Sequence, residues 1–216
     1  SFVAFLLNSV PRGVLFYSND ASVELIARHR ERLLSAGFSL LVSSPSVLDS
    51  VVNKDMLYKV AGQCAVRVPK CFVVTSCAEA AWRALETGFP LALKSTNLAG
   101  GVYAMIPSPE QLESGFREME QKLQSDLVRH RASRLMVQEW IPQTNQKLWN
   151  FNACVRSGEI VSFIIGERVR SDTRPDGTIG SALLYGRTAA SDSILNENRR
   201  LLKHLAFDGI VETEWS

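Results

Sequence analysis

Hydrophobic positions along this chain follow two spacings, one typical of short buried strands and one typical of amphipathic helices. Strand-like apolar runs occupy residues 13–17, 38–42, 68–74, 90–94 and 102–106. Helical periods fill the intervals between them, at about residues 19–37, 53–61, 76–88 and 108–130. Asn or Ser residues stand where several of these helices should begin. The alternation predicts an α/β organisation for the first 130 residues.

The second part of the chain is richer in strands. We expect strands at residues 134–140, 147–155 and 159–170, with Ser157-Gly158 as the turn of a hairpin. Residues 171–181, SDTRPDGTIGS, have no apolar periodicity and are expected to form a long functional loop. A last helix at about residues 192–206 precedes a terminal strand.

Composition excludes some classes of function. Among 216 residues, 24 basic and 22 acidic side chains give a formal charge of +2, so no strong field favours nucleic acid or a membrane as partner. The four cysteines lack C-x-x-C spacing and are expected to be reduced thiols in a cytoplasmic protein. The apolar start, SFVAFLL, is too short for a membrane anchor, and without an initiator methionine we expect the chain to be part of a longer protein.

A lysine ends one of the apolar runs and precedes a loop of small residues. In GFPLALKSTNLAGG, residues 88–101, Lys94 occupies this position. Considered by itself, such a lysine is also typical of a strand that ends in a charged residue reaching solvent. It belongs, however, to an ordered series whose other members are Lys54 at a helix start, the segment QEWIP at a strand end, an Arg-rich strand and Glu214.

The order and spacing of this series resemble the ATP-grasp superfamily, in particular its carbamoyl-phosphate-synthase-like branch with D-aspartate ligase and other carboxylate–amine ligases. The resemblance extends over nearly the whole chain. It implies an ATP-grasp fold of the α/β class in three parts. These are a partial preceding α/β domain at residues 1–52, a small nucleotide lobe at residues 53–133 and a truncated large lobe at residues 134–216.

For the nucleotide, the resemblance implies that Lys54 and Lys94 contact the phosphates of ATP. The loop that contains Gly100 and Gly101 would fold over these phosphates, although it has fewer glycines than is usual in the family and lacks the family's basic residue. Glu139, Trp140 and Ile141 would form a hinge that binds adenine through backbone atoms, with Trp140 mainly a packing residue. The alternative for this segment is an edge strand with an exposed glutamate.

For the reaction, the resemblance implies that Arg168 and Arg170 face the γ-phosphate and the acyl phosphate. The spacing of two would put both on one face of a strand, for which the alternative is a solvated edge. Glu214 matches the first magnesium ligand of the family, and Glu212, on the same face, is the rival assignment. The second pair of metal ligands would follow beyond Ser216.

The implied activity is a ligase that uses ATP and magnesium to activate a carboxylate as an acyl phosphate, which an amine or similar nucleophile then attacks. We expect the isolated chain to be inactive, because its metal site is incomplete, and to form homo-oligomers through its exposed terminal strand. Two alternatives stay open. The glycine-poor loop favours a non-catalytic nucleotide-binding module, and a kinase-like phosphotransferase would share the strand lysine and the hinge but lacks H-R-D and D-F-G.

Overall fold

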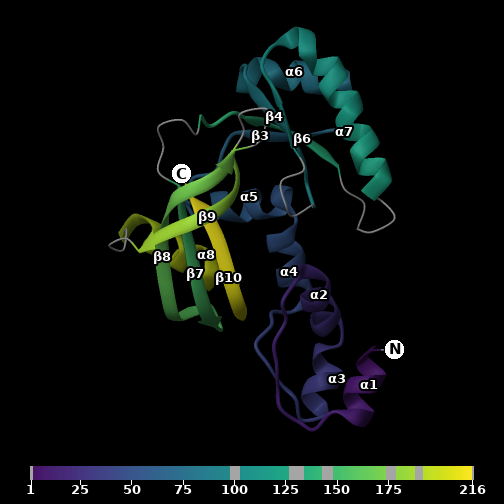
Figure 1. Ribbon diagram of the computed structural model, residues 1–216, viewed down its shortest axis with the longest axis vertical. Helices are drawn as coiled ribbons and strands as arrows, with labels where there is room; N and C mark the ends of the chain where they lie inside the picture. The colour runs from purple at the N-terminus through teal and green to yellow at the C-terminus, as the bar shows by residue number, and fades with distance from the viewer. Residues whose placement is uncertain are drawn as a thin grey trace. The chain divides into compact units, whose positions relative to one another are not determined.

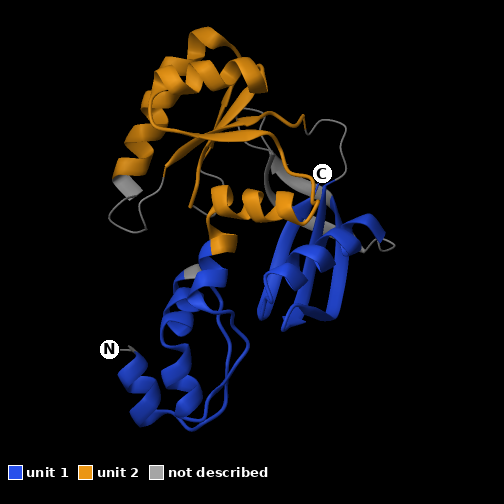
Figure 2. Cartoon of the chain, turned by 180° about the vertical axis from the view of Figure 1, so that it is seen from behind, with its two compact units in different colours: residues 1–49, 143–216 blue, residues 50–142 orange. Residues whose placement is uncertain are grey.

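The computed structural model describes residues 2–97, 103–126, 134–142, 148–173, 179–187 and 192–215. The chain divides into two compact units, one of residues 50–142 and one that combines residues 1–49 with residues 143–216 (Figure 2). Each unit contains a sheet of four strands. The division into three parts that the family resemblance implies remains a prediction. Among the helices within these described ranges, none has both the length and the apolar character that a membrane crossing requires.

The unit of residues 50–142 is an antiparallel sheet with two helices packed on one face (Figure 1). In sheet order its strands are β3 (Cys71–Val74), β6 (Leu135–Glu139), β4 (Leu91–Ser95) and β5 (Tyr103–Ile106). The helices α6 (Cys77–Thr87) and α7 (Leu112–Asp126) bury their apolar sides against alternate strand residues, among them Leu91, Leu93, Leu135 and Val137. The other face of the sheet therefore carries the residues between these, including Lys94.

Ser76 is the N-cap of α6, in agreement with a serine at the expected start of this helix. Ser76 Oγ accepts a hydrogen bond from the Glu79 amide at 3.1 Å. The Glu79 carboxylate accepts hydrogen bonds from the amide and hydroxyl of Thr75, both at 2.8 Å, and these bonds lower the pKa of Glu79. Gly88 ends the helix with φ of +75°, a conformation that side chains with a Cβ rarely adopt. A short 3₁₀ helix, η1 (Pro109–Gln111), precedes α7.

Residues 1–52 contain more helix than the pattern predicts. They form α1 (Phe2–Ser9), β1 (Val14–Leu15), α2 (Asp20–Arg28), α3 (Arg30–Ser35), β2 (Ser39–Leu40) and α4 (Pro45–Val52). The expected single helix at residues 19–37 breaks at His29, whose φ of −109° is not helical. Pro45 is the first residue of α4, where its missing amide is not needed. The strands β1 and β2 are parallel and pair over only two residues.

The second four-stranded sheet is antiparallel, in the order β10 (Gly209–Trp215), β7 (Trp149–Arg156), β8 (Glu159–Thr173) and β9 (Ile179–Arg187). The helix α8 (Asp192–His204) packs on one face and bonds to it through Asn198 Oδ1, which accepts from the Thr213 hydroxyl at 2.9 Å. The hairpin at Ser157-Gly158 is confirmed.

The prediction of a loop at residues 171–181 is wrong at both ends of this segment. Residues 171–173 continue β8, and β9 begins at Ile179; residues 174–178 lie outside the described part. Backbone pairing between β8 and β9 extends these strands without any need for an apolar pattern.

Candidate functional site

Lys54 and Lys94 lie in different elements of the unit of residues 50–142, close enough for their charges to interact. Lys54 is the first residue of α5 (Lys54–Gln63), directly after the N-cap Asn53. Its amide donates to the carbonyl of Thr96 at 2.9 Å, which fixes the start of α5 beside the residue that follows β4. Burial, and after it the charge of Lys94, lower the pKa of Lys54. Two ammonium groups thus converge where β4 ends.

Lys94 faces away from the core of its unit. Its neighbours in β4, Leu93 and Ser95, are 0% and 1% exposed, whereas Lys94 is half-buried. Its partners across the sheet are Met136 in β6 and Tyr103 in β5. The predicted phosphate loop follows, but Gly100 and Gly101 lie outside the described residues.

The predicted hinge begins at the end of an internal strand. Because β6 lies between β3 and β4, the alternative of an edge strand with an exposed glutamate is wrong. The Glu139 amide donates to the carbonyl of Lys70, and its carboxylate accepts from the amide of Lys70, both at 2.9 Å. Both groups of Glu139 are therefore engaged within the sheet. Contact of the backbone with adenine remains a prediction for Glu139, Trp140 and Ile141.

Three residues beside this hinge were not predicted from the sequence: Tyr58, Cys71 and Tyr103. The ring of Tyr103 lies 6.5 Å from that of Trp140, centroid to centroid, so two aromatic rings meet on the Lys94 side of the sheet. The Tyr58 hydroxyl donates to Gln138 Oε1 at 3.3 Å. Burial raises the pKa of Tyr58 to about 12 and that of Cys71 to about 11. At neutral pH this phenol and thiol are uncharged, so among these residues the charges come from the lysines and nearby carboxylates.

Arg168 and Glu214 meet on one face of the second sheet. Arg168 Nη2 donates to Glu214 Oε1 at 2.6 Å, and the Arg168 side chain is only 12% exposed. The alternative of a solvated edge is therefore wrong for Arg168. Arg170 pairs with Leu184, but the register of β8 shifts between Arg168 and Arg170, so their spacing no longer assures a shared face. The side chain of Arg170 lies outside the described part.

Two polar residues of β7 and β10 complete this face. Asn150 stands directly opposite Glu214, and its Nδ2 donates to Glu212 Oε1. Asn150 Oδ1 and Arg168 Nε are buried without a hydrogen-bond partner. Across the described ranges no group of three or more His, Cys, Asp or Glu side chains is placed to hold a metal ion. A magnesium ion prefers six oxygen ligands, more than Glu212 and Glu214 alone provide.

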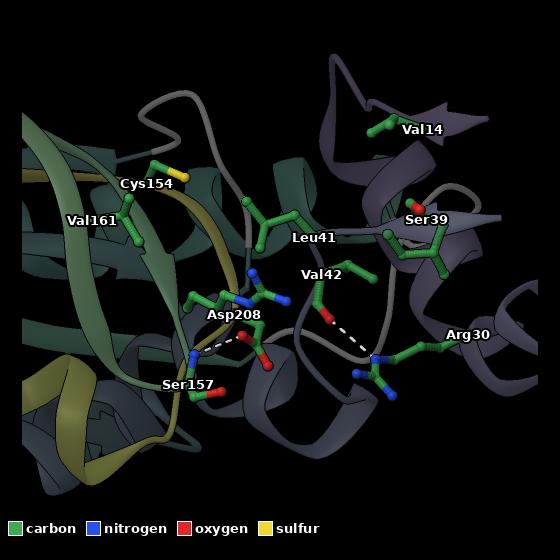
Figure 3. Close-up of a pocket in the computed structure, with 11 residues that line it drawn as sticks. Val14, Arg30, Ser39, Leu41, Val42, Cys154, Ser157, Val161 and Asp208 are labelled. Atoms are coloured by element: carbon green, nitrogen blue, oxygen red, sulfur yellow. Dashed lines mark hydrogen bonds between the residues drawn. The ribbon is translucent and has the colours of Figure 1, made fainter.

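A separate cavity of about 510 Å³ lies in the unit of residues 1–49 and 143–216 (Figure 3). Leu41, Val42, Cys154 and Val161 contribute to its lining. The Ser157 amide donates to Asp208 Oδ1 at 2.7 Å. None of the residues that the sequence predicts for the nucleotide or metal lines this cavity.

Comparison with known proteins identifies the fold. The biotin carboxylase domain of the Hydrogenobacter thermophilus 2-oxoglutarate carboxylase, solved with MgADP, ADP and bicarbonate, matches with a TM-score of 0.76 at 17% identity, over 99% of this chain and 46% of that chain. The Thermus thermophilus N5-carboxyaminoimidazole ribonucleotide synthetase gives 0.66 at 14% identity, over 98% and 52% respectively. The Bacillus licheniformis L-amino acid ligase gives 0.62 at 16% identity, over 88% and 44%.

At the level of sequence, no protein-family model matches the chain, and no curated protein does. The chain spans about half the length of the solved structures described above. At these identities the likeness concerns the fold, and it agrees with the resemblance found in the sequence. This chain has the ATP-grasp fold.

Proposed function

We propose that this chain is the nucleotide-binding part of an ATP- and magnesium-dependent ligase that joins a small carboxylate to an amine or a similar nucleophile. The observation that carries the proposal is the hydrogen bond from the Lys54 amide to the carbonyl of Thr96, which places Lys54 beside the end of the strand that carries Lys94. The lowered pKa of Lys54, caused by burial and then by Lys94, agrees with this placement. Two half-buried ammonium groups destabilise one another, and a phosphate bound between them would remove that repulsion. The solved MgADP complex of the same fold supports a nucleotide as the ligand.

In the proposed reaction an oxygen of the substrate carboxylate attacks the γ-phosphorus of ATP, and the bond from this phosphorus to the β–γ bridging oxygen breaks, so that ADP leaves. The amine nitrogen then attacks the acyl carbon, loses a proton, and phosphate leaves with both electrons of the carbon–oxygen bond. Lys54 and Lys94 would neutralise phosphate charge. Arg168 would exchange its bond to Glu214 for one to the transferred phosphoryl group, because guanidinium binds phosphate in two-point contacts.

The residues on the open face of the β10 sheet fit magnesium. Glu212 and Glu214 supply carboxylate oxygens, and the orphaned Asn150 Oδ1 is an oxygen acceptor of the kind that hard cations prefer. When bound, magnesium would neutralise part of the phosphate charge of the nucleotide.

The test separates binding from turnover. Isothermal titration with ATP should show binding that weakens about tenfold or more in Lys94→Ala, because a hydrogen bond to a charged group contributes about 1.5–3 kcal/mol. Lys122→Ala, on the exposed side of α7, is the matched control and should bind normally. ATP binding without any ADP production would favour the non-catalytic nucleotide-binding module. Unchanged affinity in Lys94→Ala would contradict the assignment.

A further inference from the structure

One buried acceptor of the β10 sheet has no partner within the protein. Asn150 is 2% exposed, and its Oδ1 makes no hydrogen bond. The other atom of the same amide, Nδ2, donates to Glu212 Oε1, which fixes the orientation of the group. Buried polar atoms are nearly always satisfied in folded proteins, so an unpaired acceptor of this kind indicates a bound water or ion.

The surroundings of this oxygen select the kind of ligand. Asn150 lies opposite Glu214 across the β7–β10 pair, and its amide contacts Glu212, so its neighbours are two carboxylates. Carboxylates offer no proton at neutral pH, and an anion would be repelled. The nearby guanidinium of Arg168 is already bonded to Glu214. A divalent cation satisfies the amide oxygen and both carboxylates together.

We propose that Asn150 is a cation ligand on β7: its Oδ1 completes an oxygen site with Glu212 and Glu214, while its Nδ2 positions Glu212. This inference rests on the proposed function, because it takes the ion to be the magnesium that accompanies the nucleotide. It also explains how a cation could be held where the described residues offer no cluster of three acidic, histidine or cysteine ligands. Both glutamates are then metal ligands, so Glu212 and Glu214 are no longer rival assignments.

The experiment uses Mn²⁺ as the probe and electron paramagnetic resonance to count the free ion, with and without ADP. Asn150→Leu keeps a branched side chain of similar shape but removes the oxygen, and we expect it to weaken Mn²⁺ binding about ten- to a hundredfold. Asn150→Asp keeps an oxygen and adds charge, so it should bind Mn²⁺ at least as tightly as the wild type. Its melting temperature should also rise more on addition of Mn²⁺, because the ion relieves repulsion among three carboxylates.

Asn152→Leu is the matched control, since Asn152 lies on the same strand and faces Glu212 across the β7–β10 pair. It should leave Mn²⁺ affinity unchanged, and circular dichroism should show that every variant is folded. Wild-type affinity in Asn150→Leu would overturn the inference. An equal loss in Asn150→Asp and Asn150→Leu would also overturn it, because only the bond to Glu212 would then matter.

ADP binding in the absence of metal distinguishes failure of this inference from failure of the proposed function. It depends on Lys54 and Lys94 and should be unchanged in the Asn150 variants. If the wild-type chain binds ADP but no Mn²⁺, the cation site is wrong and nucleotide binding stands. If the chain binds neither, both proposals are contradicted.

Discussion

Nucleotide binding should depend on pH, because pH sets the charge state of Lys54. Burial and Lys94 lower its pKa from the ordinary value of 10.5, so its ammonium loses a proton at a lower pH than an exposed lysine does. A bound phosphate stabilises the ammonium and raises that pKa again. ATP affinity should therefore be full below the lowered pKa and fall as pH rises through it, with proton uptake on binding in that range. Calorimetry across a pH series in several buffers measures both quantities.

Lys54→Arg provides the comparison, since arginine keeps its charge throughout this range. Its affinity should stay level over the alkaline pH range in which the wild type weakens. Parallel pH profiles for the two proteins would show that Lys54 does not carry the effect.

At the hinge, the ring of Trp140 and the backbone of Ile141 should contribute differently. Trp140→Ala removes a ring that lies beside Tyr103, so we expect a loss of stability of about 0.5–1.5 kcal/mol and a modest change in ATP affinity. Ile141→Pro removes an amide donor, and ATP affinity should fall further, by about 1–3 kcal/mol. Titration with ATP and thermal melting of both variants measure these effects. Equal losses of affinity would argue against adenine recognition by the backbone.

Among the elements, those with strong local signals were predictable. The caps of α6, the hairpin at Ser157-Gly158 and the strand that carries Lys94 all depend on neighbouring residues in the chain. The break at His29 and the pairing of β9 with β8 were not predictable, because the apolar period continues past His29 and because residues 171–173 pair with β9 through their backbone. Tertiary context overrides propensity at such places.

The residues of the candidate site could likewise be predicted from the sequence only in part. The pattern places Lys54 and Lys94 at element ends, but only the sheet and the contact between Lys54 and Thr96 bring them together. Asn150 carried a usable signal, since it alternates with Asn152 in an otherwise apolar strand. Alternate residues of a strand share one face, so this pattern separates a polar face of β7 from an apolar one.

The hairpin between β7 and β8 should tolerate no side chain at Gly158. Its φ is +79°, and a Cβ there would lie 2.8 Å from Lys203 Cα and 3.0 Å from the carbonyl oxygen of Leu202, both in the backbone. Gly158→Ala should lower the free energy of unfolding by about 1–2 kcal/mol from the left-handed backbone alone, with a further loss from the contact with α8. Urea unfolding measures the change.

Gly62→Ala in α5 is the matched control, because a Cβ at this position would have nothing within 4 Å and alanine favours a helix. It should raise stability by about 0.5–1 kcal/mol. Similar losses in the two variants would contradict the explanation given for Gly158.

At the scale of the whole molecule, β10 is an edge strand of its sheet within the described part of the chain. Edge strands present backbone groups that can pair with another chain, so we expect concentration-dependent self-association. Ile210 is 54% exposed on this strand, and Ile210→Lys should reduce the association by adding charge at the edge. Sedimentation velocity at several concentrations measures it. A wild-type chain that stays monomeric at high concentration would contradict the expectation.

The central claim is that Lys54 and Lys94 bind neighbouring phosphates of the same nucleotide, and a double-mutant cycle with Lys54→Met and Lys94→Met tests it most directly. Calorimetric titration with ADP should show that each single substitution weakens binding by about 1.5–3 kcal/mol. The two effects should be coupled by about 0.5 kcal/mol or more, as for residues that share one partner. Wild-type ADP affinity in either single variant, or two losses that simply add, would contradict the account.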